Sequence, residues 1–377
     1  MKKNIKRKKI LHIAECAGGV DRYLKLLLPL LQDNYEQIFI CSQHFDAESY
    51  YGIVDYVEQI KMEQSFSPFK IYRQVQRIKQ IINRICPDIV YCHSSFAGGL
   101  GRLAPISCKC KIVYNPHGWA FNMPYGLKPT VYKLLERMLV CKTDKIVAIS
   151  DFEKNNAIRN HIGNDALIKV IYSGIDLEDT IRKSTEGNVT REMLNIPMNA
   201  FLIGVSARLC ETKAPEIFVE AASIIKKQID NAYFIFIGDG ELRSDVECLI
   251  RKKGLSDSFR ITGWVNNPLA YIKLLNVGLL LSRWEGFGFA LTEYMKLCVP
   301  IVATNVCAIP NLIKNEYNGL LVPMDDYIAV ADAVVRIFRQ PSIKDHLIGN
   351  GLQVVNTKFD IHRVANQHIE LFEQLLS

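Results

Sequence analysis

Short apolar runs alternate with longer segments of mixed polarity along nearly the whole chain. The apolar runs predict two series of strands, and the segments between them predict helices, for example over 21–32, 72–85 and 214–228. The predicted strands are 9–14, 37–43, 88–93, 111–115, 145–149 and 168–172, then 201–206, 232–238, 259–263, 277–282, 299–303 and 319–322. This alternation favours parallel strands joined by right-handed crossovers, with helices on both faces of each sheet.

One polar stretch, 176–199, interrupts the alternation. It is rich in Lys, Glu, Ser, Thr and Asn and has no strong strand pattern, so it is interpreted as the connection between two domains. The 377 residues are enough for two domains of ordinary size. We therefore predict an α/β protein with two doubly wound, Rossmann-like domains, 1–175 and 200–360, facing a central cleft.

Composition is typical of a soluble globular protein, with 49% hydrophobic and 23% charged residues. No apolar run approaches the roughly 20 residues that a membrane helix needs. The apolar run after the basic start of the chain is too short for a signal-peptide core. We therefore expect a cytoplasmic protein, in which the 11 scattered cysteines are reduced and act as small core residues.

Charge is distributed unevenly. Residues 1–175 carry 25 Lys and Arg against 15 Asp and Glu, whereas 176–377 carry 21 against 24. A basic first half favours a polyanionic partner or an anionic membrane surface. Part of the excess lies in the first nine residues, which would also suit a solubilising tail. We expect no nucleic-acid partner, because there is no zinc finger, RNP-like motif or aromatic–basic interleaving.

The segment from Glu285 to Glu293 is the strongest candidate for chemistry. Two carboxylates flank a glycine-containing turn, Gly286-Phe287-Gly288-Phe289, that follows a predicted strand and opens a predicted helix. Ligands of open α/β sheets bind at this carboxyl edge, and the free N–H groups of a helix start bind anions and hydroxyls. The pattern suits a polyhydroxylated, phosphate-bearing ligand.

Two cations follow the first strand of the second series. Arg208 can grip phosphate oxygens with two hydrogen bonds, and Lys213 adds a point charge. Together they could neutralise a diphosphate leaving group, although solvated surface cations are the alternative. Gly18 and Gly19 follow the first strand of the chain and allow close backbone approach to a ligand, or an ordinary strand-to-helix turn.

His117 ends a strand of the first series and is followed by Gly118, which frees the backbone beside it. An imidazole there could bind a sugar hydroxyl or transfer a proton, and His93 is its competitor after the preceding strand. Gly238 and Gly263 end two strands of the second series and could shape a nucleotide pocket or form ordinary turns.

We expect neither a metal ion nor a cofactor. The chain has no D-x-D pair and no zinc-type histidine cluster. With Arg208 and Lys213 available, a metal is not needed to stabilise a leaving diphosphate.

Taken in order, these motifs resemble the GT4 family of retaining glycosyltransferases, which have the GT-B fold. Glu285 and Glu293 match its E-x7-E signature. The other matching segments are Gly18-Gly19-Val20, Asn115-Pro116-His117-Gly118, Val147-Ala148-Ile149-Ser150, Ile171-Tyr172-Ser173-Gly174-Ile175-Asp176, Arg208 with Lys213, Gly238-Asp239-Gly240, Thr262-Gly263 and Asn318-Gly319-Leu320-Leu321-Val322. The resemblance covers essentially the whole chain. Ser173 departs from the usual Asn, and Asp21 stands where Glu is common.

The resemblance implies a role for each site residue. Arg208 and Lys213 bind the donor diphosphate, Glu285 lies near the donor sugar, and Glu293 binds the ribose. The sugar hydroxyls are surrounded by the backbone of Gly286, Phe287, Gly288 and Phe289, the two phenylalanines standing where the family varies. His117 approaches the sugar, Gly18 and Gly19 line the cleft, and Gly238 and Gly263 belong to the donor side. The final helix, about 361–377, packs back on the N-terminal domain.

The resemblance implies a retaining transferase that uses a nucleotide-diphosphate sugar, with UDP the favoured nucleotide. The expected acceptor is a lipid-linked glycan of cell-surface polysaccharide biosynthesis, reached from the inner face of the plasma membrane. A nucleotide-sugar epimerase of similar fold is one alternative, but Arg208, Lys213 and the paired glutamates argue against it. The other alternative is a non-catalytic partner subunit, a class that usually loses these residues.

Overall fold

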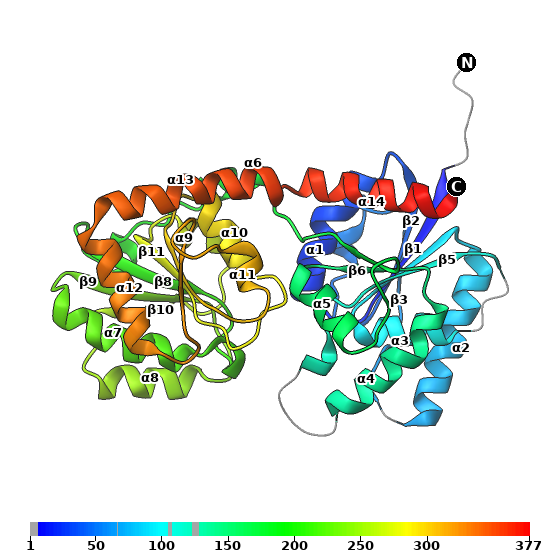
Figure 1. Ribbon diagram of the computed structural model, residues 1–377, viewed down its shortest axis with the longest axis horizontal. Helices are drawn as coiled ribbons and strands as arrows, with labels where there is room; N and C mark the ends of the chain where they lie inside the picture. The colour runs from blue at the N-terminus through cyan, green and yellow to red at the C-terminus, as the bar shows by residue number, and fades with distance from the viewer. Residues whose placement is uncertain (1–6, 66, 105–107, 123–127) are drawn as a thin grey trace, which may run out of the picture. The chain divides into compact units, whose positions relative to one another are not determined.

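A computed structural model describes residues 7–65, 67–104, 108–122 and 128–377 (Figure 1). The chain divides into two compact units, each built around a parallel sheet covered by helices. Unit 1 comprises Met1–Ser173 together with Ile361–Ser377, and unit 2 comprises Gly174–Asp360. The prediction of two doubly wound α/β domains is confirmed.

Unit 1 contains, among its described residues, a seven-stranded parallel sheet in the order β3-β2-β1-β4-β5-β6-β7. Its strands are β1 (Lys8–Ala14), β2 (Tyr35–Cys41), β3 (Tyr56–Gln59), β4 (Ile89–His93), β5 (Lys111–Asn115), β6 (Lys145–Ala148) and β7 (Ile168–Val170). Its helices are α1 (Gly19–Leu27), α2 (Pro68–Ile85), α3 (Ser95–Leu103), α4 (Lys128–Leu139), α5 (Asp151–Arg159) and α14 (Ile361–Leu376). The strand order reverses between β1 and β4, which is where open α/β sheets bind ligands.

Unit 2 repeats the plan with six described strands in the order β10-β9-β8-β11-β12-β13. Its strands are β8 (Phe201–Ser206), β9 (Ala232–Ile237), β10 (Phe259–Ile261), β11 (Val277–Leu280), β12 (Ile301–Thr304) and β13 (Leu320–Val322). Its helices are α6 (Leu177–Thr185), α7 (Pro215–Gln228), α8 (Arg243–Lys252), α9 (Pro268–Ile272), α10 (Phe289–Lys296), α11 (Ile309–Leu312), α12 (Tyr327–Arg339) and α13 (Pro341–Lys358). Here the strand order reverses between β8 and β11.

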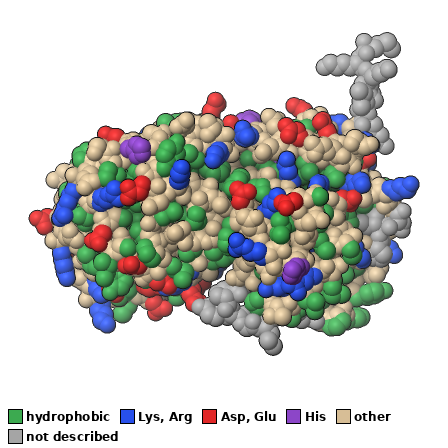
Figure 2. All heavy atoms as spheres, in the orientation of Figure 1, with side chains coloured by type: hydrophobic (Ala, Val, Ile, Leu, Met, Phe, Trp, Pro, Cys, Tyr) green, Lys and Arg blue, Asp and Glu red, His purple; other side chains and the backbone are tan. Residues whose placement is uncertain are grey.

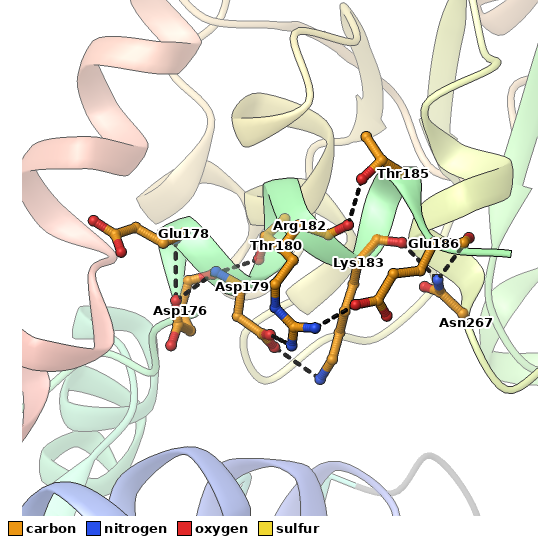
Figure 3. Close-up of polar contacts among 9 residues, drawn as sticks. All are labelled: Asp176, Glu178, Asp179, Thr180, Arg182, Lys183, Thr185, Glu186 and Asn267. Atoms are coloured by element: carbon orange, nitrogen blue, oxygen red, sulfur yellow. Dashed lines mark hydrogen bonds and ion pairs between the residues drawn. The ribbon is translucent and has the colours of Figure 1, made fainter. Parts of the chain in front are cut away.

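The polar stretch interpreted as a connection contains a regular helix, α6, which belongs to unit 2. Asp176 caps its start by accepting hydrogen bonds from two backbone N–H groups, and Asp179 pairs with both Arg182 and Lys183 one turn later (Figure 3). Caps and ion pairs at this spacing stabilise a helix without a long apolar stripe. This is why strand and core patterns in the sequence gave no sign of it.

The two faces of the unit 1 sheet differ in chemistry. One face is apolar, with Leu11, Ile13, Val90 and Cys92 in a single buried cluster. The opposite face carries fully buried polar side chains, which come from β1, β2, β4, α1 and α14. These are His12, Gln37, Tyr91, His93, Tyr23 and His368. A buried polar face of this kind is stable only when its groups are hydrogen-bonded to one another.

His368 joins α14 to this face. Its Nδ1 lies 2.8 Å from the carbonyl oxygen of Val364, so Nδ1 carries the proton and Nε2 is an acceptor. The hydroxyls of Tyr23 and Tyr91 lie 2.9 and 3.1 Å from that Nε2, whose single lone pair accepts a hydrogen bond from this pair of hydroxyls. The histidine is therefore held neutral, and burial lowers its pKa to about 4.

These buried histidines predict that unit 1 is destabilised by acid. Burial also lowers the pKa of His12 to about 3. In the unfolded chain both groups bind protons below about pH 6.5, whereas in the folded chain they do not. Stability is therefore fully present above about pH 6.5 and is lost as the pH falls toward 4. Urea unfolding at several pH values between 7.5 and 4.5 measures the slope of the free energy of unfolding against pH.

A matched pair of substitutions on α14 tests the cause. His368→Gln should reduce the slope by up to about 1.4 kcal/mol per pH unit, because one titrating group is removed. Asn366→Gln, at an exposed position of the same helix, changes no titrating group and should leave the slope unchanged. Equal slopes in the two variants would contradict this account.

Candidate functional site

In unit 2, Lys213 and Glu285 form an ion pair across 72 positions of sequence. Lys213 ends a short 3-10 turn after β8, and Glu285 lies in the loop between β11 and α10. Ser282 Oγ donates a hydrogen bond of 3.1 Å to the same carboxylate oxygen. The side chains of Lys213 and Glu285 are 22% and 13% exposed, so the pair is held in place yet open to a ligand. It stands at the carboxyl edge, where the strand order reverses.

The glycine turn after Glu285 begins α10. Gly288 precedes the helix with a φ of 92°, a conformation that favours glycine. Phe287 is buried and packs edge-on against Phe289, with 5.2 Å between ring centroids, and against Phe359 at 5.6 Å. The ring of Phe287 therefore anchors the turn in the core, which leaves the backbone of the turn to line the site.

Glu293 lies on α10 and is 2% exposed. The next residue, Tyr294, accepts a hydrogen bond of 2.8 Å from the backbone N–H of Ser206 and donates one of 3.3 Å to the carbonyl of Leu279. This hydroxyl ties α10 to the ends of both β8 and β11. Sequence reasoning missed Tyr294, because nothing in its immediate sequence marks it as a strut between two strands.

Arg208 follows β8 but does not contact the Lys213–Glu285 pair. Its guanidinium pairs with Glu241, with Nη2 at 3.0 Å and Nε at 3.1 Å from Oε2. Both side chains are more than half exposed, so the pair contributes little to stability. Arg208 is therefore free to exchange this carboxylate for another anion.

Gly238 closes β9 with its backbone against the loop after β8. A Cβ atom at this position would lie 2.0 Å from the carbonyl oxygen of Ala207, and φ is 144°. Its N–H donates to Thr262 Oγ1 at 3.2 Å, and it forms a bridge with Gly263. The loops after β8, β9 and β10 are thus packed backbone to backbone, which positions Arg208.

In unit 1, His117 and His93 lie in contact rather than acting as competitors. His117 Nε2 is 3.1 Å from His93 Nδ1, and the edge of the Tyr23 ring lies against His117 at a centroid distance of 4.7 Å. The His117 backbone has a φ of 52°, held by a hydrogen bond of 2.9 Å from its N–H to Asn115 Oδ1. Burial lowers the pKa of His117 to about 3, so the ring is neutral.

Gly18 and Gly19 form the exposed start of α1. Gly18 has a φ of 78°, and a Cβ atom at either glycine would meet no other atom within 4 Å. The glycine requirement at position 18 is therefore conformational, and the open space beside both backbones can admit a ligand.

Two family models match the chain. The model for glycosyl transferases group 1 matches residues 188–354, and the model for glycosyltransferase family 4 matches 17–179. The chain belongs to the GT4-type glycosyltransferases.

Two relatives of this transferase are themselves named as glycosyltransferases. It is 31% identical over 258 residues to the UDP-Gal:alpha-D-GlcNAc-diphosphoundecaprenol alpha-1,3-galactosyltransferase of Escherichia coli, covering 66% of each chain. It is 23% identical over 370 residues to CapM of Staphylococcus aureus, a capsular polysaccharide biosynthesis glycosyltransferase, covering 94% of each.

Among solved structures, HepE of Anabaena in complex with UDP has the same fold. The TM-score is 0.81 at 18% identity, over 97% of this chain and 100% of HepE. The GT-B fold of the transferase is thereby shown.

In this glycosyltransferase four of the residues expected at the site, Lys213, Glu285, Arg208 and His117, fall into three groups. Lys213 joins Glu285, Arg208 joins Glu241, and His117 joins His93. The first two groups belong to unit 2 and the third to unit 1. Sequence reasoning missed two partners, Glu241, which directly follows the Gly238-Asp239-Gly240 motif, and Ser282, which ends a predicted strand.

The described residues of the transferase hold neither a cluster of metal-ligating side chains nor a membrane-spanning helix. Across the described ranges, no group of three or more His, Cys, Asp or Glu side chains gathers as a ligand set. None of the helices in the described part of the chain is long and apolar enough to cross a bilayer.

The close approach at Gly238 gives a prediction about unit 2. Gly238→Ala should lower the free energy of unfolding by at least about 2 kcal/mol, because the added methyl group collides with a carbonyl oxygen that cannot move alone. Gly254→Ala is the control, since Gly254 has a φ of 68° but no atom within 4 Å of the added Cβ. Gly254→Ala should lower the free energy of unfolding by about 1 kcal/mol, because it introduces backbone strain without a collision. Equal unfolding midpoints in urea would contradict the described packing.

Proposed function

We propose that this glycosyltransferase moves a sugar from a UDP-sugar to a lipid-linked glycan acceptor, with retention at the anomeric carbon, during assembly of a cell-surface polysaccharide. The observation that carries the proposal is the Lys213–Glu285 pair at the carboxyl edge of unit 2. The names of the Escherichia coli and Staphylococcus aureus relatives support the donor, acceptor and pathway.

Two cations, Lys213 and Arg208, stabilise the leaving diphosphate, and they differ in how firmly they are held. Lys213 is held beside Glu285, whereas Arg208 is exposed and exchangeable. A diphosphate arriving between them would draw Arg208 from Glu241 and share Lys213 with Glu285. Fixed positive charge where negative charge develops is the largest single source of catalysis in many transfer reactions.

The transfer needs no separate general base, because the leaving group itself takes the acceptor proton. The bond from the anomeric carbon to the diphosphate oxygen breaks, and the acceptor oxygen bonds to the same face of that carbon. The acceptor proton passes to the departing phosphate oxygen. Glu285 accepts hydrogen bonds from the sugar, and Glu293 from the ribose. The chain supplies charge and orientation, which fits the neutral state of His117.

Substitution of Lys213 tests this assignment. Lys213→Ala should lower kcat on the order of 100-fold, because one fixed cation at the leaving group is lost. Transfer is measured with a panel of UDP-sugars and a polyprenyl-diphosphate-linked glycan, and the anomeric configuration of the wild-type product is read by NMR.

Lys253→Ala is the matched control. Lys253 pairs with Glu220 at similar exposure in the same unit but away from the carboxyl edge. The control should change kcat less than twofold. Wild-type rates in Lys213→Ala, or an inverted product, would overturn the proposal. Interconversion of the donor sugar without acceptor would favour an epimerase, and donor binding without any turnover would favour a non-catalytic subunit.

The same proposal includes a membrane surface, because the acceptor is lipid-linked. Helix α2 carries five Lys and Arg and no Asp or Glu. Exposed aromatic side chains lie at its start, with Phe69 68% and Tyr72 62% exposed. On α4, Leu134 and Met138 are 58% and 63% exposed. Hydrophobic side chains gather over these two helices at the lower right of Figure 2. We call this set the α2–α4 face.

The α2–α4 face combines the two features that bind peripheral proteins to anionic bilayers. Its basic residues suit negative headgroups, and its exposed apolar side chains suit the interface below them. The one acidic residue of α4, Glu136, is buried against Arg102 at 2.8 Å. Ion pairs with Glu58 and Glu63 offset part of the positive charge of α2, at Lys70, Arg77 and Arg84. A pocket of about 290 Å³ opens between α2, α3 and α4, and Phe96, Leu100 and Leu135 are among its apolar lining residues.

Vesicle binding tests the α2–α4 face. The double variant Leu134→Glu/Met138→Glu should bind phosphatidylglycerol vesicles at least tenfold more weakly than wild type, because it removes apolar contacts and adds like charge. Met198→Glu is the control, since Met198 is 76% exposed on unit 2. Sedimentation with phosphatidylglycerol or phosphatidylcholine vesicles, at low and high salt, measures binding. Equal binding by the double variant and the control would refute this surface while leaving the transferase assignment intact.

A further inference from the structure

Arg283 joins the two loops that carry the Lys213–Glu285 pair. It lies two residues before Glu285, in the loop between β11 and α10. Its backbone N–H donates a hydrogen bond of 2.9 Å to the carbonyl oxygen of Thr212, and its Nη1 donates another of 2.9 Å to the carbonyl oxygen of Glu211. These carbonyl groups belong to the two residues immediately before Lys213, so Arg283 holds the backbone that leads to that cation.

The other two nitrogens of the Arg283 guanidinium reach two further elements of unit 2. Nε donates a hydrogen bond of 2.8 Å to Asp325 Oδ1, in the loop after β13. Nη2 pairs with Glu216, in the first turn of α7. Helix α7 begins two residues after Lys213. We call these four hydrogen bonds, one from the backbone and three from the guanidinium, the Arg283 clamp.

The planar guanidinium explains why an arginine stands here. Its N–H donors form a rigid fork, so contacts on three sides fix both the place and the orientation of the group. The turn that carries Lys213 needs such support. It is a single 3-10 turn, a conformation with poor internal hydrogen-bond geometry, and it ends at Ala214 with a left-handed φ of 47°. The clamp supplies the contacts that the turn cannot make within itself.

We infer that Arg283 is a positioning residue that acts through Lys213, by fixing the turn that bears this cation against the loop that bears Glu285. A preorganised cation stabilises developing negative charge only when it stands where that charge forms. The effect on catalysis rests on the proposed function, in which Lys213 faces the leaving diphosphate. The clamp itself does not, because it is complete in the protein without a ligand.

A purely stabilising role is the competing explanation for these ion pairs. The side chains of Arg283, Glu216 and Asp325 are 30%, 38% and 41% exposed. Ion pairs this open to water contribute little to the free energy of unfolding. Loss of the Arg283 side chain should therefore slow the transfer reaction much more than it lowers stability, whereas a structural strut would do the reverse.

Nitrogen-15 NMR of the ligand-free, arginine-labelled protein tests the clamp. The Arg283→Met and Arg208→Met spectra assign the two Nε–H signals. We expect the Nε–H of Arg283 to exchange with water at least about tenfold more slowly than that of Arg208, because Arg283 is bonded on three sides and Arg208 is held by one exposed carboxylate. Equal exchange rates would overturn the clamp.

A double-mutant cycle tests whether the clamp acts through Lys213. Arg283→Met should lower kcat about tenfold, because a displaced cation no longer matches the charge on the leaving group. In the Lys213→Ala background the same change should lower kcat by less than about twofold, because the cation that the clamp positions is already absent. A second tenfold loss in that background would overturn the positioning role.

Arg283→Lys tests the fork. A lysine keeps the positive charge but has a single nitrogen, which cannot serve three separate acceptors. This variant should therefore lose about as much activity as Arg283→Met. Wild-type kcat in Arg283→Lys would show that charge alone suffices, and would overturn the clamp as the reason for an arginine.

Arg336→Met is the matched control. Arg336 makes two hydrogen bonds to Glu316 and is 38% exposed, but Glu316 precedes β13 and lies at the opposite edge of the sheet. The control should change kcat by less than about twofold and should unfold in urea at nearly the same midpoint as Arg283→Met. An equal loss of kcat in the control, or a much lower midpoint in Arg283→Met, would refute the positioning role.

The two kinds of measurement separate this inference from the proposed function. Failure of all transfer by the wild-type protein would refute the proposed function, and the NMR exchange rates would still decide whether the clamp exists. Wild-type transfer with additive losses in the double-mutant cycle would refute the role of Arg283 alone.

Discussion

Parallel pairing is the constraint on which the rest of this molecule depends. When every strand of a sheet runs the same way, every strand ends at the same edge, and the loops that follow are brought together whatever their distance in sequence. Lys213 after β8 and Glu285 after β11 meet for this reason, as do His93 at the end of β4 and His117 after β5. In both units, side chains from the ends of neighbouring strands meet at one edge of the sheet, although the side chains differ.

The two cations of unit 2 illustrate different ways of holding charge. Lys213 is fixed by a carboxylate that is itself held by Ser282, so its position is set before any ligand arrives. Arg208 is held only by an exposed partner. A site with one fixed and one exchangeable cation can orient a diphosphate on arrival and tighten around it afterwards, which divides the work of recognition from that of charge stabilisation.

Much of the fold could be predicted because strong apolar runs mark buried parallel strands. The predicted bounds of β5 and β8 agree with the structure at both ends. The short edge strand β3 was missed, since none of its four residues is buried. Helix α6 was missed because ion pairs and a cap, rather than an apolar stripe, hold it.

The sequence predicted which residues belong to the candidate site but not which of their side chains contact one another. Motif order indicated that Arg208, Lys213 and Glu285 belong together, yet only the structure separates Arg208, paired with Glu241, from the other two. The direction of a side chain after a strand depends on local turn geometry, such as the left-handed backbone at Ala214. The contacts of His93 with His12 and His117 depend on the register of several strands, which no single segment of sequence encodes.

The division of the chain has a consequence for biosynthesis. Unit 1 is interrupted at Ser173 and completed only by Ile361–Ser377, so all of unit 2 is translated before unit 1 has its last helix. His368, which hydrogen-bonds Tyr23 and Tyr91, arrives with that helix. Domains tend to fold as they emerge from the ribosome. The nascent unit 1 therefore lacks α14, and the polar face of its sheet stays without that helix until unit 2 has been translated. Unit 2, by contrast, is contiguous in sequence and can fold without interruption.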